Sequence, residues 1–305
     1  MTMISTTRTM TNPEFAPGVC AGSSPHVDLS APLSHADCLL PQWSVAPAVC
    51  ALVTTRDGGV SAPPYGRLRK GVPERGGLNL GLHTGDDPQH IADNRARLQR
   101  LTRATPAWLT QVHGCDVVLA EEAVRVVQSG VAALRADASV TAEPGIACVV
   151  MVADCLPVLF ADATGRAVGA AHAGWRGLLE GVLERTATRV AQLAGAAPDV
   201  HAFLGPAIGP LAFEVGPEVR AAFLSAAAYA ERDATEAAFV PRADRPGKYL
   251  ANLVGLARLR LARVGVTAPS GGEWCTVTLA DQFYSYRREN QTGRFAGLIW
   301  IKTNA

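Results

Sequence analysis

Three short segments organise the sequence: Gln111-Val112-His113-Gly114, Val152-Ala153-Asp154-Cys155-Leu156-Pro157 and Ala171-His172-Ala173-Gly174-Trp175-Arg176-Gly177. Each segment places one strong metal ligand beside a Gly or Pro. Cys155 follows an apolar run over 146–152, which predicts a buried strand, and the runs over 157–161 and 167–171 predict two more. Two imidazoles and a thiolate at strand ends suit Zn²⁺ or copper, with a fourth position left for water or substrate.

The spacing of these ligands also has a simpler explanation. Cys is among the most buried residue types, and a single His is commonly a hydrogen-bonding partner rather than a ligand. His113, Cys155 and His172 lie far apart in the sequence, and no zinc-finger spacing brings them together. From spacing alone, a metal site and an ordinary core both remain open.

The same segments resemble the signature blocks of the YfiH/YlmD laccase-domain family, whose members have been called polyphenol oxidases or laccases and purine nucleoside phosphorylases. The resemblance covers residues 54–301 and is carried by the three blocks in order. It implies that His113, Cys155 and His172 bind the metal, with Zn²⁺ expected and Cu²⁺ as the alternative. It also implies an α+β fold in one domain, with a mixed, layered β core flanked by helices; periodicity alone predicts only alternating strands and helices.

Composition predicts a soluble enzyme-sized globule. The chain has 305 residues, of which 48% are hydrophobic and 18% charged, with a formal net charge of +1. This balance gives no electrostatic reason to expect nucleic acid or a membrane surface as a partner, and no apolar run reaches the length of a membrane span. Seven scattered Cys without a Cys-x-x-Cys pair predict reduced thiols. We therefore expect a cytoplasmic protein. A monomer is expected as well, and the resemblance implies small-molecule substrates.

The N-terminal segment differs from the rest of the chain. Met1-Thr2-Met3-Ile4 resembles the start of a cloning-vector β-galactosidase fragment, so we predict an appended leader over about the first 20 residues. Residues 21–45 are rich in Pro, Ser and His and are predicted to be irregular. The predicted division is therefore a leader and irregular segment over 1–45 and a single catalytic domain over 46–305.

Local patterns predict the main elements. Asp87 and Pro88 begin a helix as N-cap and first residue, Pro217 opens another to about Tyr229, and an apolar stripe from Leu250 to Val264 predicts a third that Gly265 ends. A single helix is predicted from Gly174 to Leu193 on its apolar periodicity. Further predictions are strands over 49–55, 108–111, 117–120, 201–204 and 296–301, a mobile loop over 67–77 and a loop over 230–248.

The start of the helix at Gly174 to Gly177 is predicted to bind phosphate. Free backbone N–H groups and the helix dipole attract anions at such an end. Arg176 adds a guanidinium whose paired donors suit phosphate, at a position where the dipole disfavours a purely structural cation.

Further site residues come from the family resemblance. Arg56 belongs to an Arg-x-Gly-Gly-Val-Ser block near the substrate site, although a surface arginine beside a hairpin turn is an equal alternative. Asn79 and His83 precede a helix beside the active centre, and His83 and Asp154 are candidates for moving protons. Arg287 and Arg294 in the C-terminal block either line the anion pocket or brace their loop through carboxylates. Asp137 either orders a metal-binding His or caps a turn.

Several functions are compatible with these residues. The resemblance implies phosphorolysis of adenosine, inosine and methylthioadenosine, with adenosine deamination as a second activity. A copper-dependent polyphenol oxidase is the first alternative, but seven His without a His-x-His pair are too few for a multi-copper cluster. A Cys-His hydrolase using Cys155 and His172 is the second alternative, and it requires a metal-free thiolate. A non-enzymatic, metal-stabilised scaffold is the remaining one.

Overall fold

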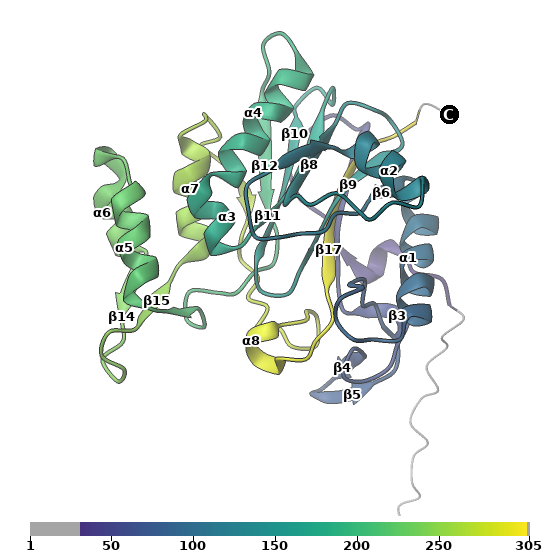
Figure 1. Cartoon of the computed structure of the whole chain (residues 1–305), viewed down its shortest axis with the longest axis horizontal. Coiled ribbons are helices and arrows are strands. Elements are labelled where there is room, and N and C mark those ends of the chain that lie inside the picture. Colours follow the sequence, from purple (N-terminus) through teal and green to yellow (C-terminus); the bar gives the residue numbers. More distant parts are fainter. Residues whose placement is uncertain (1–30, 304–305) are drawn as a thin grey trace, which may run out of the picture.

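Two large β-sheets lie face to face between two helical layers in the computed structural model, which describes residues 31–303 (Figure 1). The five-stranded sheet has the order β1-β2-β17-β9-β6, and the six-stranded sheet has the order β16-β12-β10-β11-β8-β7. The first sheet consists of β1 (Cys38–Leu39), β2 (Val49–Thr54), β6 (Thr105–Ala107), β9 (Ile146–Val152) and β17 (Phe295–Ile301). The second consists of β7 (Val117–Leu119), β8 (Ala138–Thr141), β10 (Leu156–Asp162), β11 (Val168–Ala173), β12 (Val200–Leu204) and β16 (Ser270–Gly271).

Both sheets are mixed, since β6–β9, β7–β8 and β12–β16 pair in parallel and the other pairs are antiparallel. The central strands are buried on both faces, which explains their continuous apolar runs. In β9, Cys148, Val150 and Val152 belong to the core between the sheets, while Ala147, Val149 and Met151 belong to the core under the outer helix. The buried strands predicted from these runs are confirmed.

Helices cover the outer face of each sheet. α1 (Pro88–Thr102) packs on the five-stranded side through Leu98. On the opposite side, α3 (Trp175–Glu180), α4 (Val182–Ala194) and α7 (Leu253–Ala262) share a core with β10 and β11. α2 (Ala120–Gln128) contributes Ala123 and Val124 to the core between the sheets. The layered α+β fold predicted from the resemblance is confirmed.

Smaller elements surround this core. A three-stranded sheet of order β13-β15-β14 lies beside α5 and α6, at the left of Figure 1. Its members and the remaining elements are η1 (His35–Asp37), β3 (Asp57–Ser61), β4 (Arg67–Arg69), β5 (Val72–Glu74), β13 (Glu214–Val215), α5 (Pro217–Ala226), η2 (Tyr229–Glu231), α6 (Arg232–Ala237), β14 (Phe239–Pro241), β15 (Tyr249–Ala251) and α8 (Tyr286–Glu289).

The helix predicted from Gly174 to Leu193 is two helices, which corrects the prediction. Gly181 adopts a left-handed backbone with φ 90°, and its N–H closes α3 on the carbonyls of Gly177 and Leu178. Glycine occupies this conformation without the steric cost that a Cβ would add. The chain then starts α4 in a new direction, although the apolar periodicity continues through the break.

Four local predictions were wrong, because local sequence patterns do not reveal short elements or fix where an element begins. The segment predicted as a mobile loop over 67–77 contains the β4–β5 hairpin, and the loop predicted over 230–248 contains α6 and β14. The strand predicted over 108–111 lies earlier, at β6. The predicted third helix begins at Leu253, where the Asn252 side chain accepts from the Gly255 N–H, so Leu250 belongs to β15.

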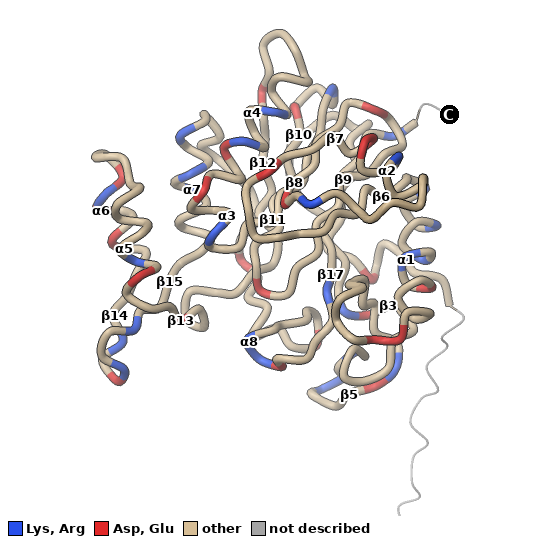
Figure 2. Tube along the Cα trace, viewed as in Figure 1, with Lys and Arg blue, Asp and Glu red and all other residues tan. Residues whose placement is uncertain are grey.

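The predicted leader over the first 20 residues lies outside the described residues. The proposed boundary at residue 46 stays a prediction, and β1 before it pairs with β2. Between residues 31 and 303, no helix combines the length and apolarity required to cross a membrane. In Figure 2, Lys and Arg alternate with Asp and Glu along the chain, consistent with the near-zero net charge.

Candidate metal centre and its cavity

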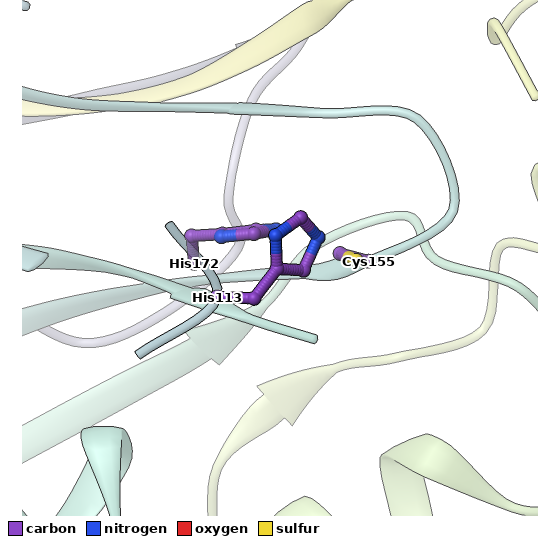
Figure 3. Close-up of side chains that lie close together, drawn as sticks. All are labelled: His113, Cys155 and His172. Carbon is purple, nitrogen blue, oxygen red and sulfur yellow. The ribbon is translucent and has the colours of Figure 1, made fainter. Parts of the chain in front are cut away.

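His113, Cys155 and His172 converge on one point (Figure 3). His113 lies in the loop between β6 and β7, Cys155 in the turn that leads from β9 to β10, and His172 in β11. Their ligand atoms lie within 4.8 Å of one another, and the two imidazole rings are edge-to-face with centroids 4.8 Å apart. The three segments, far apart in the sequence, thus meet near the turn where the chain passes from one sheet to the other. The three motifs quoted first in the sequence predicted this meeting.

The buried carboxylate of Asp137 fixes two of the three side chains. Asp137 accepts hydrogen bonds from the backbone N–H groups of Val112, His113 and Gly114, at 2.7–3.2 Å. It also lies 2.8 Å from Nδ1 of His172. Asp137 therefore caps the loop that carries His113 and orients the His172 ring, so both alternatives left open for it hold. With Nδ1 engaged, Nε2 of His172 is the nitrogen free to bind a metal.

The loop before His113 is also tied to β9. The Gln111 side chain donates to the Met151 carbonyl and accepts from the Met151 N–H, each at 2.8 Å, as a neighbouring strand would. His113 itself has φ 61°, an uncommon conformation for a residue other than glycine. Anchors on both sides hold His113 in this conformation, which aims its ring toward Cys155 and His172.

The turn that carries Cys155 is held by its neighbour Asp154. The Asp154 carboxylate accepts from the Thr276 hydroxyl and from the Arg287 backbone N–H, both at 2.6 Å. Its carbonyl accepts from the Ile208 N–H at 2.8 Å. Asp154 has φ 93°, so three distant segments maintain a strained backbone beside the candidate ligand.

The electrostatics of the three side chains favour a thiolate. Burial alone raises the pKa of the Cys155 thiol, but the charge of His172 and hydrogen bonds from both imidazoles lower this pKa to about 6. Burial lowers the pKa of His172, and the Cys155 thiolate and Asp137 raise it further than burial lowers it. The thiolate is the form of cysteine that binds metals.

The donor set fits a borderline-soft metal ion. One thiolate and two imidazoles leave one position of a tetrahedral zinc site open, and the same donors bind copper. Gly174 keeps the site clear, since a Cβ there would lie 3.0 Å from Cys155 Sγ and 3.0 Å from His113 Cδ2. The identity of the metal stays a prediction.

A cavity of about 870 Å³ opens onto these three residues. Its volume falls in the range of about 300–1,000 Å³ found for small-molecule sites. Aromatic and aliphatic side chains form much of its wall, among them Leu82, Trp108, Trp175, Phe213 and Tyr286. An apolar wall with a few polar groups suits a flat heterocycle.

Four further residues predicted for the site line this cavity: His83, Asp154, Arg287 and Arg294. The Arg287 side chain donates to the Glu214 carbonyl at 3.2 and 3.3 Å. Partial burial, together with the charges of Arg294, Arg95 and His113, lowers the pKa of His83. The Arg294 and Arg287 side chains have no carboxylate ion pair within residues 31–303, so the cavity-lining alternative is the one their geometry favours.

Three residues predicted for the site lie elsewhere. Arg56 is 2% exposed and donates to Glu289, Ala280 and Gly66, so its guanidinium braces loops rather than facing the cavity. Asn79 is fully buried, and its amide holds the backbone of Gly81 and Arg294. Arg176 is exposed and stacks on Trp175 at 4.5 Å, outside the cavity lining.

Arg95 is a charged cavity residue that sequence reasoning missed. It lies on α1 between the buried residues Ile91 and Leu98, with spacings of four and three residues that place it on the same face. Its guanidinium donates to the Leu80 carbonyl and stacks on Trp108 at 3.9 Å. An arginine on the apolar stripe of α1 was the available signal.

Comparisons with known proteins agree on the family. A family model described as "Multi-copper polyphenol oxidoreductase laccase" matches residues 50–302. A Pseudomonas aeruginosa protein named purine nucleoside phosphorylase is 49% identical over 264 residues, covering 87% of this chain and 98% of that protein. Escherichia coli purine nucleoside phosphorylase YfiH is 48% identical, covering 86% of this chain and 98% of that protein.

Solved structures give the same answer. A Neisseria meningitidis protein of the family designated DUF152 superposes with a TM-score of 0.75 at 43% identity, covering 88% of this chain and all of that one. The chain belongs to the YfiH/YlmD laccase-domain family.

Proposed function

We propose that this protein is a metal-dependent purine nucleoside phosphorylase that acts on adenosine, inosine and methylthioadenosine. Each substrate would react with phosphate to give the free base and the corresponding pentose 1-phosphate. The observation that carries the proposal is the His113–Cys155–His172 group on the wall of a cavity that arginines and aromatic side chains also line. The names of the relatives at 48–49% identity support the same activity.

The proposed metal is Zn²⁺, with Cu²⁺ as the alternative. When bound, the ion would supply a Lewis acid and lower the pKa of a bound water. His113, Cys155 and His172 would hold it, and Asp137 would keep His172 in the tautomer that binds through Nε2. Adenosine deamination as a side activity is part of the proposal, because such a water is the nucleophile that replaces the amino group at C6.

Other residues of the cavity have proposed roles in phosphorolysis. A phosphate oxygen would bond to the anomeric carbon while the bond to the purine nitrogen breaks, and the purine leaves with that electron pair and takes up a proton. Trp175, Phe213 and Tyr286 offer faces against which a purine ring can stack. Asp154 and His83 line the same cavity and are our candidates for moving the proton. A cytoplasmic monomer stays a prediction.

Copper-dependent polyphenol oxidation is the second candidate, because the family description names it. Within residues 31–303, His113, Cys155 and His172 are the one set of side chains arranged to hold a metal ion. One set does not hold the several copper ions of that description. A hydrolase is the third candidate, because Cys155, His172 and Asp137 are arranged as a nucleophile, a base and an orienting carboxylate.

An assay of adenosine with phosphate on protein of known metal content tests the proposal. Chromatography should show adenine and ribose 1-phosphate, formed only when phosphate is present. The His113→Ala variant should lose zinc and turnover together. The matched control is His201→Ala, which replaces a partly exposed histidine on β12 and should keep both. Loss of activity on chelation and its return with zinc would support the metal's role.

Three other outcomes would overturn the proposal. Zinc-loaded protein that releases no base, but oxidises phenols once loaded with copper, would favour the polyphenol oxidase. Turnover that survives complete metal removal and disappears on alkylation of Cys155 would favour the hydrolase. Inosine formed from adenosine without phosphate dependence would make deamination the main activity.

A further inference from the structure

Two half-buried arginines of the cavity wall have no acidic partner. Arg95 donates through Nε and Nη2 to the Leu80 carbonyl, at 3.0 and 2.8 Å. Arg294 donates through Nη1 to the carbonyls of Thr292 and Gly293, at 3.1 and 3.0 Å. Neither forms an ion pair with a carboxylate of the described chain.

Well-buried guanidiniums elsewhere in the molecule are neutralised. Arg56 pairs with Glu289 at 2.9 Å, and Arg260 pairs with Glu184 at 3.4 Å. A buried charge is costly unless an opposite charge and hydrogen bonds accompany it. The absence of such partners at Arg95 and Arg294 therefore distinguishes the cavity from the rest of the fold.

The two arginines flank one short loop. The Leu80 carbonyl accepts from the Arg95 guanidinium, and the Leu80 N–H donates to the Arg294 carbonyl at 3.1 Å. The aliphatic part of Arg294 packs against Gly81, where a Cβ would lie 2.8 Å from Arg294 Cγ. His83, two residues further on, lies near enough to both guanidiniums for their charges to lower its pKa. The Arg95 and Arg294 side chains and His83 thus lie around one short loop of the cavity wall.

Three acidic groups act on Arg294 through their charge, Cys155, Asp154 and Tyr286, and the first two have other partners. Cys155 belongs to the candidate metal ligands, and Asp154 accepts from Thr276 and from the Arg287 backbone. Arg294 keeps Nε and Nη2, and Arg95 keeps Nη1, without a hydrogen-bond partner in the described part of the chain. Guanidinium N–H groups without a protein partner can donate hydrogen bonds to the oxygens of a tetrahedral anion.

We propose that Arg95 and Arg294 form the phosphate-binding subsite of the cavity, in place of the exposed Arg176. The identity of the anion rests on the proposed phosphorylase function. The position of the subsite rests on the two cavity arginines that have no carboxylate partner. Arg95 is positioned by Trp108, and Arg294 by Gly81, so both guanidiniums are held before the anion binds. Phosphate bound there would lie beside His83 and on the same cavity wall as the metal centre.

Binding of inorganic phosphate without nucleoside tests the site independently of turnover. Isothermal titration on the metal-loaded protein should give a Kd that rises at least about tenfold in Arg95→Gln and in Arg294→Gln. Arg100→Gln, an exposed change of the same charge on the same helix, should leave the Kd within about twofold. Arg95→Lys keeps the charge and should bind more tightly than Arg95→Gln, which separates lost charge from a disturbed fold.

Steady-state kinetics distinguish the phosphate subsite from the base subsite. The KM for phosphate should rise at least about tenfold in Arg294→Gln, while the KM for adenosine changes by less than about threefold. Arg176→Gln should leave the phosphate KM near that of the wild type. A rise in Arg176→Gln without one in Arg294→Gln would overturn the proposal in favour of the helix start.

The two proposals fail in different ways. Wild-type protein that binds phosphate through Arg95 and Arg294 but releases no purine would overturn the phosphorylase and leave the anion subsite established. Unchanged phosphate binding in folded Arg95→Gln and Arg294→Gln would overturn the subsite, whatever the turnover.

Discussion

Arg287 and Arg288 are neighbours in α8, yet they belong to different regions of the molecule. The Arg288 guanidinium donates to the carbonyls of Thr276, Val277 and Phe283 and to the Glu289 carboxylate. The Arg287 side chain donates only to the Glu214 carbonyl and lies on the cavity wall. The C-terminal segment over 275–294 therefore has one side built for structure and another that faces the ligand.

The structural side is a brace formed by Arg56, Arg288 and Glu289. Arg56 is 2% exposed, pairs with Glu289 and stacks over the Tyr284 ring at 4.7 Å. The Tyr284 hydroxyl in turn donates to the Tyr65 carbonyl at 2.5 Å. The brace thus connects the N-terminal strands to the loop that carries Tyr286 and Arg287.

The two sides differ in whether the charge of their arginines is neutralised by a carboxylate of the protein. In the brace, guanidiniums meet a carboxylate and several carbonyls, so their buried charge is compensated within the fold. On the cavity wall, the Arg95 and Arg294 guanidiniums meet backbone carbonyls, the Met151 sulfur and the Trp108 ring, but no carboxylate. The fold leaves compensation there to a ligand, so arginine substitutions on the two sides should affect different measurements.

Arg56→Ala should have the largest effect on stability. It leaves the partly buried Glu289 without one of its two cations and the Gly66 carbonyl without a donor, which costs about 3 kcal/mol of unfolding free energy. Urea denaturation followed by circular dichroism would measure this loss. Arg294→Gln in the same experiment should change stability by less than about 1 kcal/mol. A stable Arg56→Ala with a raised nucleoside KM would return Arg56 to the role of substrate contact.

Arg288→Ala and Arg287→Ala form the sharper pair, since the residues are adjacent. Arg288→Ala leaves three carbonyls and a carboxylate with fewer donors, so unfolding free energy should fall by about 2 kcal/mol. Arg287→Ala should cost less than about 0.5 kcal/mol and act on turnover instead. Thermal melts and initial rates on both variants check this, and equal melting temperatures would contradict the division into two sides.

Sequence patterns predicted the buried strands and the helix beginning at Asp87 and Pro88, because these depend on local apolarity and capping. The Asp87 side chain accepts from the Gln89 N–H at 2.8 Å, as an N-cap should. The break at Gly181 was missed, because a glycine within a helical pattern is compatible with both a continuous helix and a left-handed turn. Short elements such as β4, β5 and α6 depend on tertiary contacts that no local pattern records.

For the site, the motifs pointed to three side chains that the structure brings together, and the family resemblance predicted their role as metal ligands and added His83, Arg287 and Arg294. Arg56, Asn79 and Arg176 could not be placed in the same way, since proximity in sequence to a motif does not fix the direction of a side chain. Arg95 was missed for the converse reason, because it comes from a helix without a recognisable site motif and reaches the cavity through the packing of α1 on β9.

The smallest expected effect is a pH dependence carried by Glu289 in the brace. Burial raises the pKa of Glu289, but the hydrogen bond from Thr292, the charge of Arg56 and hydrogen bonds from Arg288 and Arg56 lower it below its ordinary 4.5. Because the folded-state pKa lies below the unfolded one, the stabilisation is fully present above about pH 4.5 and is lost as pH falls through the folded value. The unfolding free energy of wild type minus that of Glu289→Gln should therefore shrink as the pH falls from 6 to 3.

Subtracting the two unfolding free energies cancels the contribution of every group that titrates in the same way in both proteins, including the groups at the metal centre. Glu122→Gln, an exposed change of the same kind on α2, should give a curve parallel to that of the wild type. Since the cavity arginines have no carboxylate partner, Arg294→Gln should also run parallel to the wild type over this range. The opposite result would be a pH-dependent stability difference for Arg294→Gln and none for Glu289→Gln. It would mean that a carboxylate neutralises the cavity arginine and that the brace is not neutralised in this way.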